Sequence, residues 1–228
     1  MLGGSSGPSR AARWFSLALS LALVAACGDG KPAASKPGAP TTSAPPATPA
    51  RAAGKGVRIK IEGPDKKLFA TLKPGKQDLH IEPAEGGAIV GSLKDGVRTY
   101  QLADGTVLLR AKTDSTRTTF EGADGKLKYE LKAAGRKVQL TLSGQSGDPY
   151  TLLRTANDRI KLMRGKTEIG RVTFDPLKLK ARARNPQGVS QFDVSSPRTS
   201  DGFALLLLSD LPVQDRLVLL TELYSRGL

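Results

Sequence analysis

The chain has one cysteine and one histidine among its 228 residues, and only 5% of its residues are aromatic. Zinc fingers and disulfide frameworks need several cysteines or a cysteine–histidine set, so both are excluded. At 39%, the hydrophobic share is too small for a protein with several membrane spans. The sequence also lacks a G-x-x-x-x-G-K-[ST] phosphate-binding loop and an H-E-x-x-H zinc motif. We therefore expect no cofactor and no metal.

One apolar run without charged residues extends from Trp14 to Ala26, and Arg10 and Arg13 precede it. The run is shorter than the roughly 20 residues that a transmembrane helix needs. A basic start, a short apolar stretch and small residues at its end are typical of a secretory signal peptide. The sequence thus predicts an exported protein.

The residues Val24-Ala25-Ala26-Cys27 resemble the lipobox of bacterial lipoproteins. The resemblance implies cleavage after residue 26, a diacylglycerol on the Cys27 thiol and usually a fatty acid such as palmitate on the new amine. Two or three acyl chains, at about 0.8 kcal/mol per buried CH₂, anchor a protein durably. The alternative is conventional cleavage with Cys27 as an ordinary residue. By resemblance to enterobacterial sorting, Gly28 after the cysteine favours the outer over the inner membrane of the envelope.

Composition divides the chain into three parts. Residues 1–26 are the expected signal peptide, and residues 27–56 hold the cysteine and a tract rich in proline and alanine without large apolar residues. Such a tract cannot bury enough surface to fold, so we expect a disordered tether. From Val57 to Leu228 the composition changes, and this part is the expected folded domain.

Apolar and polar residues alternate along much of the domain, as in Val57–Ile61, Lys126–Lys132 and Val138–Leu142. Strict alternation indicates antiparallel strands with one buried face. Asp95-Gly96, Asp104-Gly105 and other Gly pairs supply the tight turns between them. The pattern predicts a mainly β fold, an antiparallel meander of about a dozen strands that forms a barrel or a sandwich.

The C-terminal part breaks the alternation. Phe203–Leu208 is apolar on every side, and apolar residues then recur at helical spacing as far as Tyr224. We expect a hydrophobic helix over 203–226, which either packs across the end of a sandwich or runs through a closed barrel. This order of elements over 57–228 resembles the tubby-like and phospholipid-scramblase-like barrel. The resemblance implies that the helix threads the barrel, and no residue of a lipid or calcium site maps onto the chain.

The whole chain has a net charge of +14, and its positive charge is concentrated in one part. Residues 125–184 hold 15 lysines and arginines but only 5 acidic residues. A strand over Leu177–Arg184 would place Leu177, Leu179 and two alanines on one face and four cations on the other. These four residues, the candidate site for an anionic ligand, are Lys178, Lys180, Arg182 and Arg184. Anionic lipid, a polysaccharide or an acidic protein would relieve their repulsion, whereas they could also be an ordinary solvated face.

The sequence's histidine and a group of acidic residues are weaker candidates for a functional site. His80 alternates with apolar residues and is expected to be a surface histidine of a strand. Asp114, Glu121 and Asp124 are close in sequence, but turns collect aspartate for conformational reasons. Nucleic acid matches the charge but not the exported location. The sequence thus favours a non-catalytic envelope lipoprotein that binds an anionic partner, with a hydrolase using paired carboxylates as the alternative and the oligomeric state open.

Overall fold

The computed structural model of this protein describes residues 56–228, which belong to one compact unit. The predicted signal peptide, Cys27 and nearly all of the predicted tether lie outside the described residues. We call residues 56–228 the barrel unit. No helix within it is long and apolar enough to cross a membrane.

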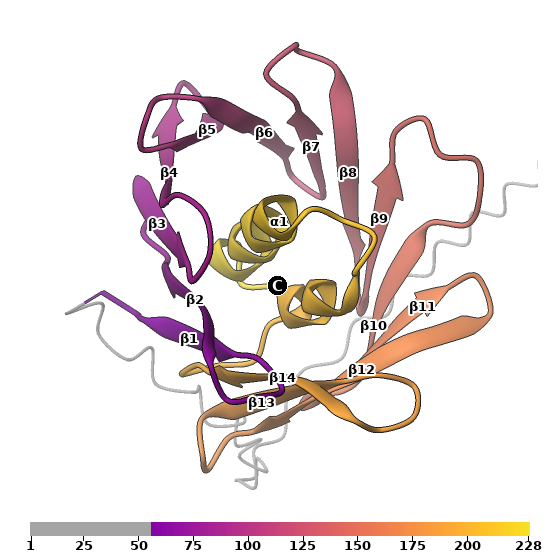
Figure 1. Cartoon of the computed structure of the whole chain (residues 1–228). Helices are drawn as coiled ribbons and strands as arrows, with labels where there is room; N and C mark the ends of the chain where they lie inside the picture. Colours follow the sequence, from indigo (N-terminus) through magenta and orange to yellow (C-terminus); the bar gives the residue numbers. More distant parts are fainter. Residues whose placement is uncertain (1–55) are drawn as a thin grey trace, which may run out of the picture. The chain divides into compact units, whose positions relative to one another are not determined.

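Antiparallel strands joined in sequence order make up most of the barrel unit (Figure 1). The fourteen strands are β1 (Ile59–Glu62), β2 (Leu68–Lys73), β3 (Asp78–Pro83), β4 (Ile89–Lys94), β5 (Val97–Leu102), β6 (Val107–Asp114), β7 (Arg117–Glu121), β8 (Leu127–Ala134), β9 (Lys137–Leu142), β10 (Tyr150–Ala156), β11 (Arg159–Arg164), β12 (Thr167–Asp175), β13 (Lys180–Arg184) and β14 (Ser190–Ser195). The last strand pairs with the first, Ile61 opposite Val194, and closes the sheet into a barrel. The closed ring has no open edge, so every strand finds two partners. This confirms the predicted meander and decides between barrel and sandwich.

The alternation in sequence becomes an alternation between the inside and the outside of the barrel. In β11, Ile160 and Leu162 are buried, whereas Arg159 and Lys161, which alternate with them, are exposed. The other strands repeat the pattern, so the inner wall is apolar and the outer surface is polar. Residues 56–228 form one continuous core among themselves, so we expect this unit to fold on its own.

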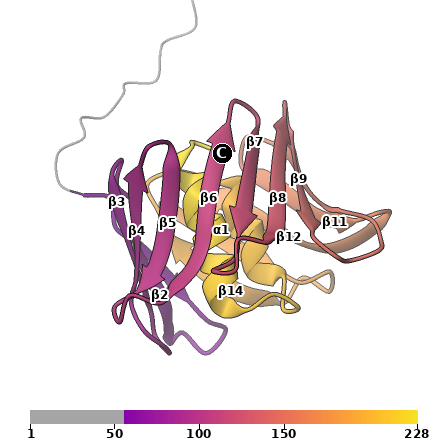
Figure 2. The ribbon, with the colours of Figure 1, turned by 90° about the horizontal axis from the view of Figure 1, so that it is seen from above.

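Two short helices fill the interior of the barrel (Figures 1 and 2). The 3₁₀-helix η1 spans Asp201–Leu207 and the α-helix α1 spans Val213–Ser225, and the two pack against each other as a helical hairpin. Residues 215–224 of α1 are all buried, so the helix has no solvent-facing side in this stretch. The hydrophobic helix through the barrel is thereby confirmed, although the expected element over 203–226 is divided in two.

The break between η1 and α1 follows from Pro212. Pro212 lies at the N-cap of α1, where its missing N–H costs no helical hydrogen bond. At Gly202 the two helices approach closely, because a Cβ there would lie 2.8 Å from the Leu220 carbonyl oxygen. A longer apolar helix could not turn back inside the barrel, so the division lets the chain fill its width.

The turns lie at the two ends of the barrel, which we call the helix-turn end and the chain-entry end. The helix-turn end holds the η1–α1 turn together with the β1–β2, β5–β6 and β13–β14 turns. The chain-entry end holds residues 56–58, which lead into β1, together with the β2–β3, β4–β5 and β12–β13 turns. The predicted Asp95-Gly96 turn lies at the chain-entry end, with φ of 51° and 77°. Such left-handed pairs are typical of two-residue hairpins.

Candidate functional site

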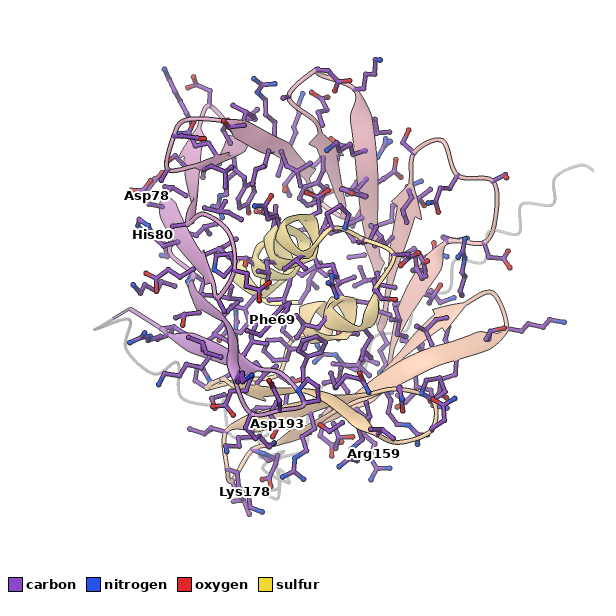
Figure 3. All side chains as sticks on the ribbon, viewed as in Figure 1. Phe69, Asp78, His80, Arg159, Lys178 and Asp193 are labelled. Atoms are coloured by element: carbon purple, nitrogen blue, oxygen red, sulfur yellow. The ribbon has the colours of Figure 1, made fainter. Side chains whose placement is uncertain are left out.

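The outer surface of β11, β12 and β13 carries a strip of cations. We define the basic strip as the outward-facing lysines and arginines of these strands, namely Arg159, Lys161, Arg171, Lys180, Arg182 and Arg184. Arg159 points away from the barrel in Figure 3. The buried residues between them, such as Val172 and Ala183, face the core. The pleat therefore gathers on one surface the charges of three neighbouring strands.

The strand register places three of these cations side by side. Lys161 lies opposite Arg171, and Arg171 lies opposite Arg184, so the three form a row across the sheet. Neighbouring strands are roughly 4.8 Å apart, well within the Debye length of about 8 Å at physiological ionic strength. Their charges therefore repel one another, and an anion placed over the row would be attracted by all three.

Acidic side chains neutralise only part of the strip. The Glu168 carboxylate lies 3.0 Å from the Lys161 amine and 3.3 Å from the Arg171 Nε. Asp193 of β14 lies 3.7 Å from the Arg182 Nε. Partial burial would raise the pKa of Asp193, but Lys66, Ser190 and Arg182 lower it below its ordinary value. Asp193 therefore stays ionised at neutral pH.

The four cations predicted as the candidate site do not share one strand. Lys180, Arg182 and Arg184 alternate with Ala181 and Ala183 on β13, as expected. Lys178 lies instead in the β12–β13 turn, 3.8 Å from the Asp175 carboxylate, and points away from the barrel (Figure 3). Within residues 56–228, Lys180 and Arg184 have no acidic group in ion-pair range.

Two leucines lie on a different side from the one that alternation predicted. Leu177 and Leu179 were expected on the buried face with Ala181, but 95% of Leu177 and 44% of Leu179 are exposed. The reason is a turn over residues 176–179: Asp175 Oδ1 accepts hydrogen bonds from the backbone N–H groups of Leu177 and Lys178. β13 therefore begins only at Lys180.

Sequence reasoning missed half of the basic strip. Arg159, Lys161 and Arg171 lie far from β13 in sequence and join it only through the pairing of β11 with β12 and β12 with β13. The alternation of Ile160, Lys161 and Leu162 was a usable signal, because in a meander successive strands are neighbours. The register, which decides that Arg171 meets Arg184, carried no signal in the sequence.

The remaining sequence candidates do not come together. His80 is exposed on the outside of β3, opposite Lys73, and points away from the barrel (Figure 3). Asp114 lies at the chain-entry end of β6, whereas Glu121 and Asp124 lie at the helix-turn end of β7 and in the turn after it. Among residues 56–228, no group of three or more acidic, histidine or cysteine side chains could hold a metal ion.

Three wall tyrosines bind carboxylates of the helical hairpin and its turn. Tyr100 donates a hydrogen bond to Glu222 (2.6 Å), Tyr129 donates one to Asp215 (2.6 Å), and Tyr150 donates one to Asp210. Burial and the adjacent carboxylates raise the pKa of all three tyrosines, in the case of Tyr150 to about 12. The tyrosines therefore remain protonated donors and fix the position of α1 within the barrel.

A hydrolase with paired carboxylates would need two acids facing one cleft. The buried acids of the hairpin each engage a separate group instead. Asp201 binds the Arg154 guanidinium at 2.8 Å, and Asp215 and Glu222 bind different tyrosines. Burial raises the pKa of Asp201, although Arg154 acts in the opposite direction. In the described residues these acids serve to hold the hairpin in place.

A groove of about 830 Å³ opens at the helix-turn end. Its apolar lining includes Phe69 and Phe192, whose ring centroids lie 4.9 Å apart, together with Val213 at the start of α1. Phe69 faces the interior in Figure 3. Asp65, Glu85 and Lys67 also line the groove, so its lining has one more acidic than basic group and suits an anion less than the basic strip does.

Comparison of the chain with protein-family models, with curated proteins and with solved structures finds no match. The resemblances to the lipobox and to the tubby-like and scramblase-like barrel stay predictions.

Proposed function

We propose that the protein is a lipid-anchored lipoprotein of the bacterial cell envelope that has no catalytic role and uses its basic strip to dock onto an anionic envelope component. The observation that supports docking is the row Lys161, Arg171 and Arg184, three directly neighbouring cations with only Glu168 to neutralise them. In the folded barrel these like charges repel one another, and an anionic partner would relieve this repulsion. The anchor through Cys27 would keep the protein at an envelope membrane, and Gly28 after the cysteine favours the outer membrane.

The anchor is tested by metabolic labelling. Cells that express the full chain and are fed a fatty-acid analogue are expected to label the protein, whereas Cys27→Ala is expected to abolish the label because no other thiol exists in the chain. Membrane fractionation of both forms is the second measurement. An unlabelled wild-type protein would contradict the anchor.

Docking is tested by co-sedimentation of the barrel unit with vesicles. We expect binding to phosphatidylglycerol-containing vesicles but not to pure phosphatidylcholine. Binding should fall steeply as salt rises from about 50 to about 500 mM, because the shorter Debye length screens the attraction. Each basic group near an anionic surface contributes about 1 kcal/mol. Lys180→Ser with Arg184→Ser should therefore weaken binding roughly thirtyfold.

The control variant removes the same charge elsewhere. Lys112 and Lys128 are exposed on β6 and β8, outside the basic strip. Lys112→Ser with Lys128→Ser is expected to leave binding nearly unchanged. An equal loss in both double variants would show that only net charge matters and would refute a defined docking surface.

A further inference from the structure

The β12–β13 turn, residues 176–179, presents two exposed leucines beside two lysines. Leu177 is 95% exposed and Leu179 44% exposed, while Lys178 and Lys180 flank Leu179. Single apolar residues on a surface need no explanation, but two in one four-residue turn at the end of the basic strip are a local concentration. Leucine side chains with lysines between them suit the boundary of a bilayer, where lysine amines reach the headgroups.

The backbone conformation at Leu179 suits glycine better than leucine. Leu179 has φ of +52°, a left-handed conformation that costs a residue with a Cβ about 1–2 kcal/mol. Glycine or asparagine usually fills such a position. Leu179 is 44% exposed, so its burial offsets this cost only in part. The exposed part of Leu179 is available for a contact outside the barrel unit.

The turn also lies where the chain enters the barrel. Lys180 is opposite Ser195, and Ser195 is opposite Lys60 near the start of β1. The Ser196 N–H donates a hydrogen bond to the Leu179 carbonyl (2.9 Å). At roughly 4.8 Å per strand, Lys180 and Lys60 are about 10 Å apart. The described chain therefore enters β1 at the same end of the barrel as the exposed leucines.

We propose that the β12–β13 turn inserts Leu177 and Leu179 into the headgroup region of an anionic bilayer, with Lys178 and Lys180 at the lipid phosphates. This inference rests on the proposed docking function and names its partner as lipid. The basic strip then faces the membrane, and the β12–β13 turn enters it.

A tryptophan at position 177 reports the insertion directly. Trp14 is the only tryptophan of the chain, so the barrel unit has none. With phosphatidylglycerol-containing vesicles, Leu177→Trp is expected to shift its emission to the blue and to be quenched by lipids brominated near the headgroup. The matched control is Val189→Trp, because Val189 is 56% exposed in the β13–β14 turn at the helix-turn end. Its emission is expected to stay unchanged.

Two further variants separate this inference from the proposed function. Leu177→Ser is expected to weaken vesicle binding about tenfold, because an inserted leucine loses its apolar contact. Leu179→Gly is expected to raise the thermal stability of the barrel unit and still weaken vesicle binding. If Leu177→Ser binds like wild type while Lys180→Ser with Arg184→Ser does not, docking stands and insertion is refuted.

The remaining outcomes also decide. An emission shift of Leu177→Trp that grows with protein concentration in the absence of lipid would show contact between copies of the chain and would overturn insertion. Binding that is lost in Leu177→Ser but is independent of salt and of the strip would instead refute the docking function. An unchanged emission with vesicles that sediment the protein would place the turn outside the bilayer.

Discussion

Replacement of Leu206 by aspartate is expected to prevent the barrel unit from folding. Leu206 lies in η1 inside the barrel and is 1% exposed, and its carbonyl accepts a hydrogen bond from Arg216 (2.9 Å). An unpaired carboxylate there would cost several kcal/mol, which is comparable to the 5–15 kcal/mol that holds a typical domain together. Circular dichroism during urea titration should show no cooperative transition for Leu206→Asp.

The same substitution in the exposed β12–β13 turn is the control. Leu177→Asp introduces an identical side chain where 95% of the leucine is exposed, so the free energy of unfolding should change by less than about 0.5 kcal/mol. A cooperative transition of Leu206→Asp at the wild-type midpoint would mean that η1 is not a core element.

Separation of the ion pair between Arg98 and Glu222 is expected to cost about 3–5 kcal/mol, as for other buried pairs that lose one partner. The two side chains are each 8% exposed, and Arg98 Nη1 lies 3.5 Å from Glu222 Oε2, which also accepts a hydrogen bond from the Tyr100 hydroxyl. Arg98→Met leaves the Glu222 carboxylate buried without its cation, and Glu222→Gln leaves the guanidinium without its anion. Urea unfolding followed by circular dichroism measures both losses.

A double-mutant cycle shows how far the two groups act through each other. Arg98→Met with Glu222→Gln removes both charges, so its loss should be well below the sum of the single losses. Tyr100 still donates to the glutamine carbonyl in this variant, which keeps α1 in place. Single losses that simply add in the double variant would contradict a direct interaction between Arg98 and Glu222.

The sequence was sufficient to predict the class of fold because its signals are local. Alternation marks the buried face of a strand such as β11 without knowledge of its neighbours, and Asp95-Gly96 marks a hairpin from its own backbone preference. The uniformly apolar stretch before Leu208 likewise indicates burial by itself. Each of these elements is found in the structure close to its predicted place.

The parts that the sequence did not predict have two causes: one local turn, and contacts between residues that are distant in sequence. The Asp175 side chain forms two hydrogen bonds within the turn after it, and these end the alternation that was expected to continue through Leu177. The contacts of Glu222 with Tyr100 and Arg98 had no signal near it in the sequence, because both partners lie more than 100 residues away. The basic strip was half found for the same reason, since only strand pairing brings Arg171 to Arg184.

The enclosed helical hairpin also determines when this chain can reach its final form. The residues that fill the barrel, 201–225, follow all fourteen strands, and the ring closes only when β14 meets β1. In a growing polypeptide, the apolar inner faces of the strands therefore lack the helices that pack against them. Contacts between residues so remote in sequence also form slowly. Assembly must wait until residues 201–225 have been synthesised. A product that ends before residue 201 would expose apolar surface that chaperones and proteases recognise, and the cell would remove it rather than accumulate a barrel without its helices.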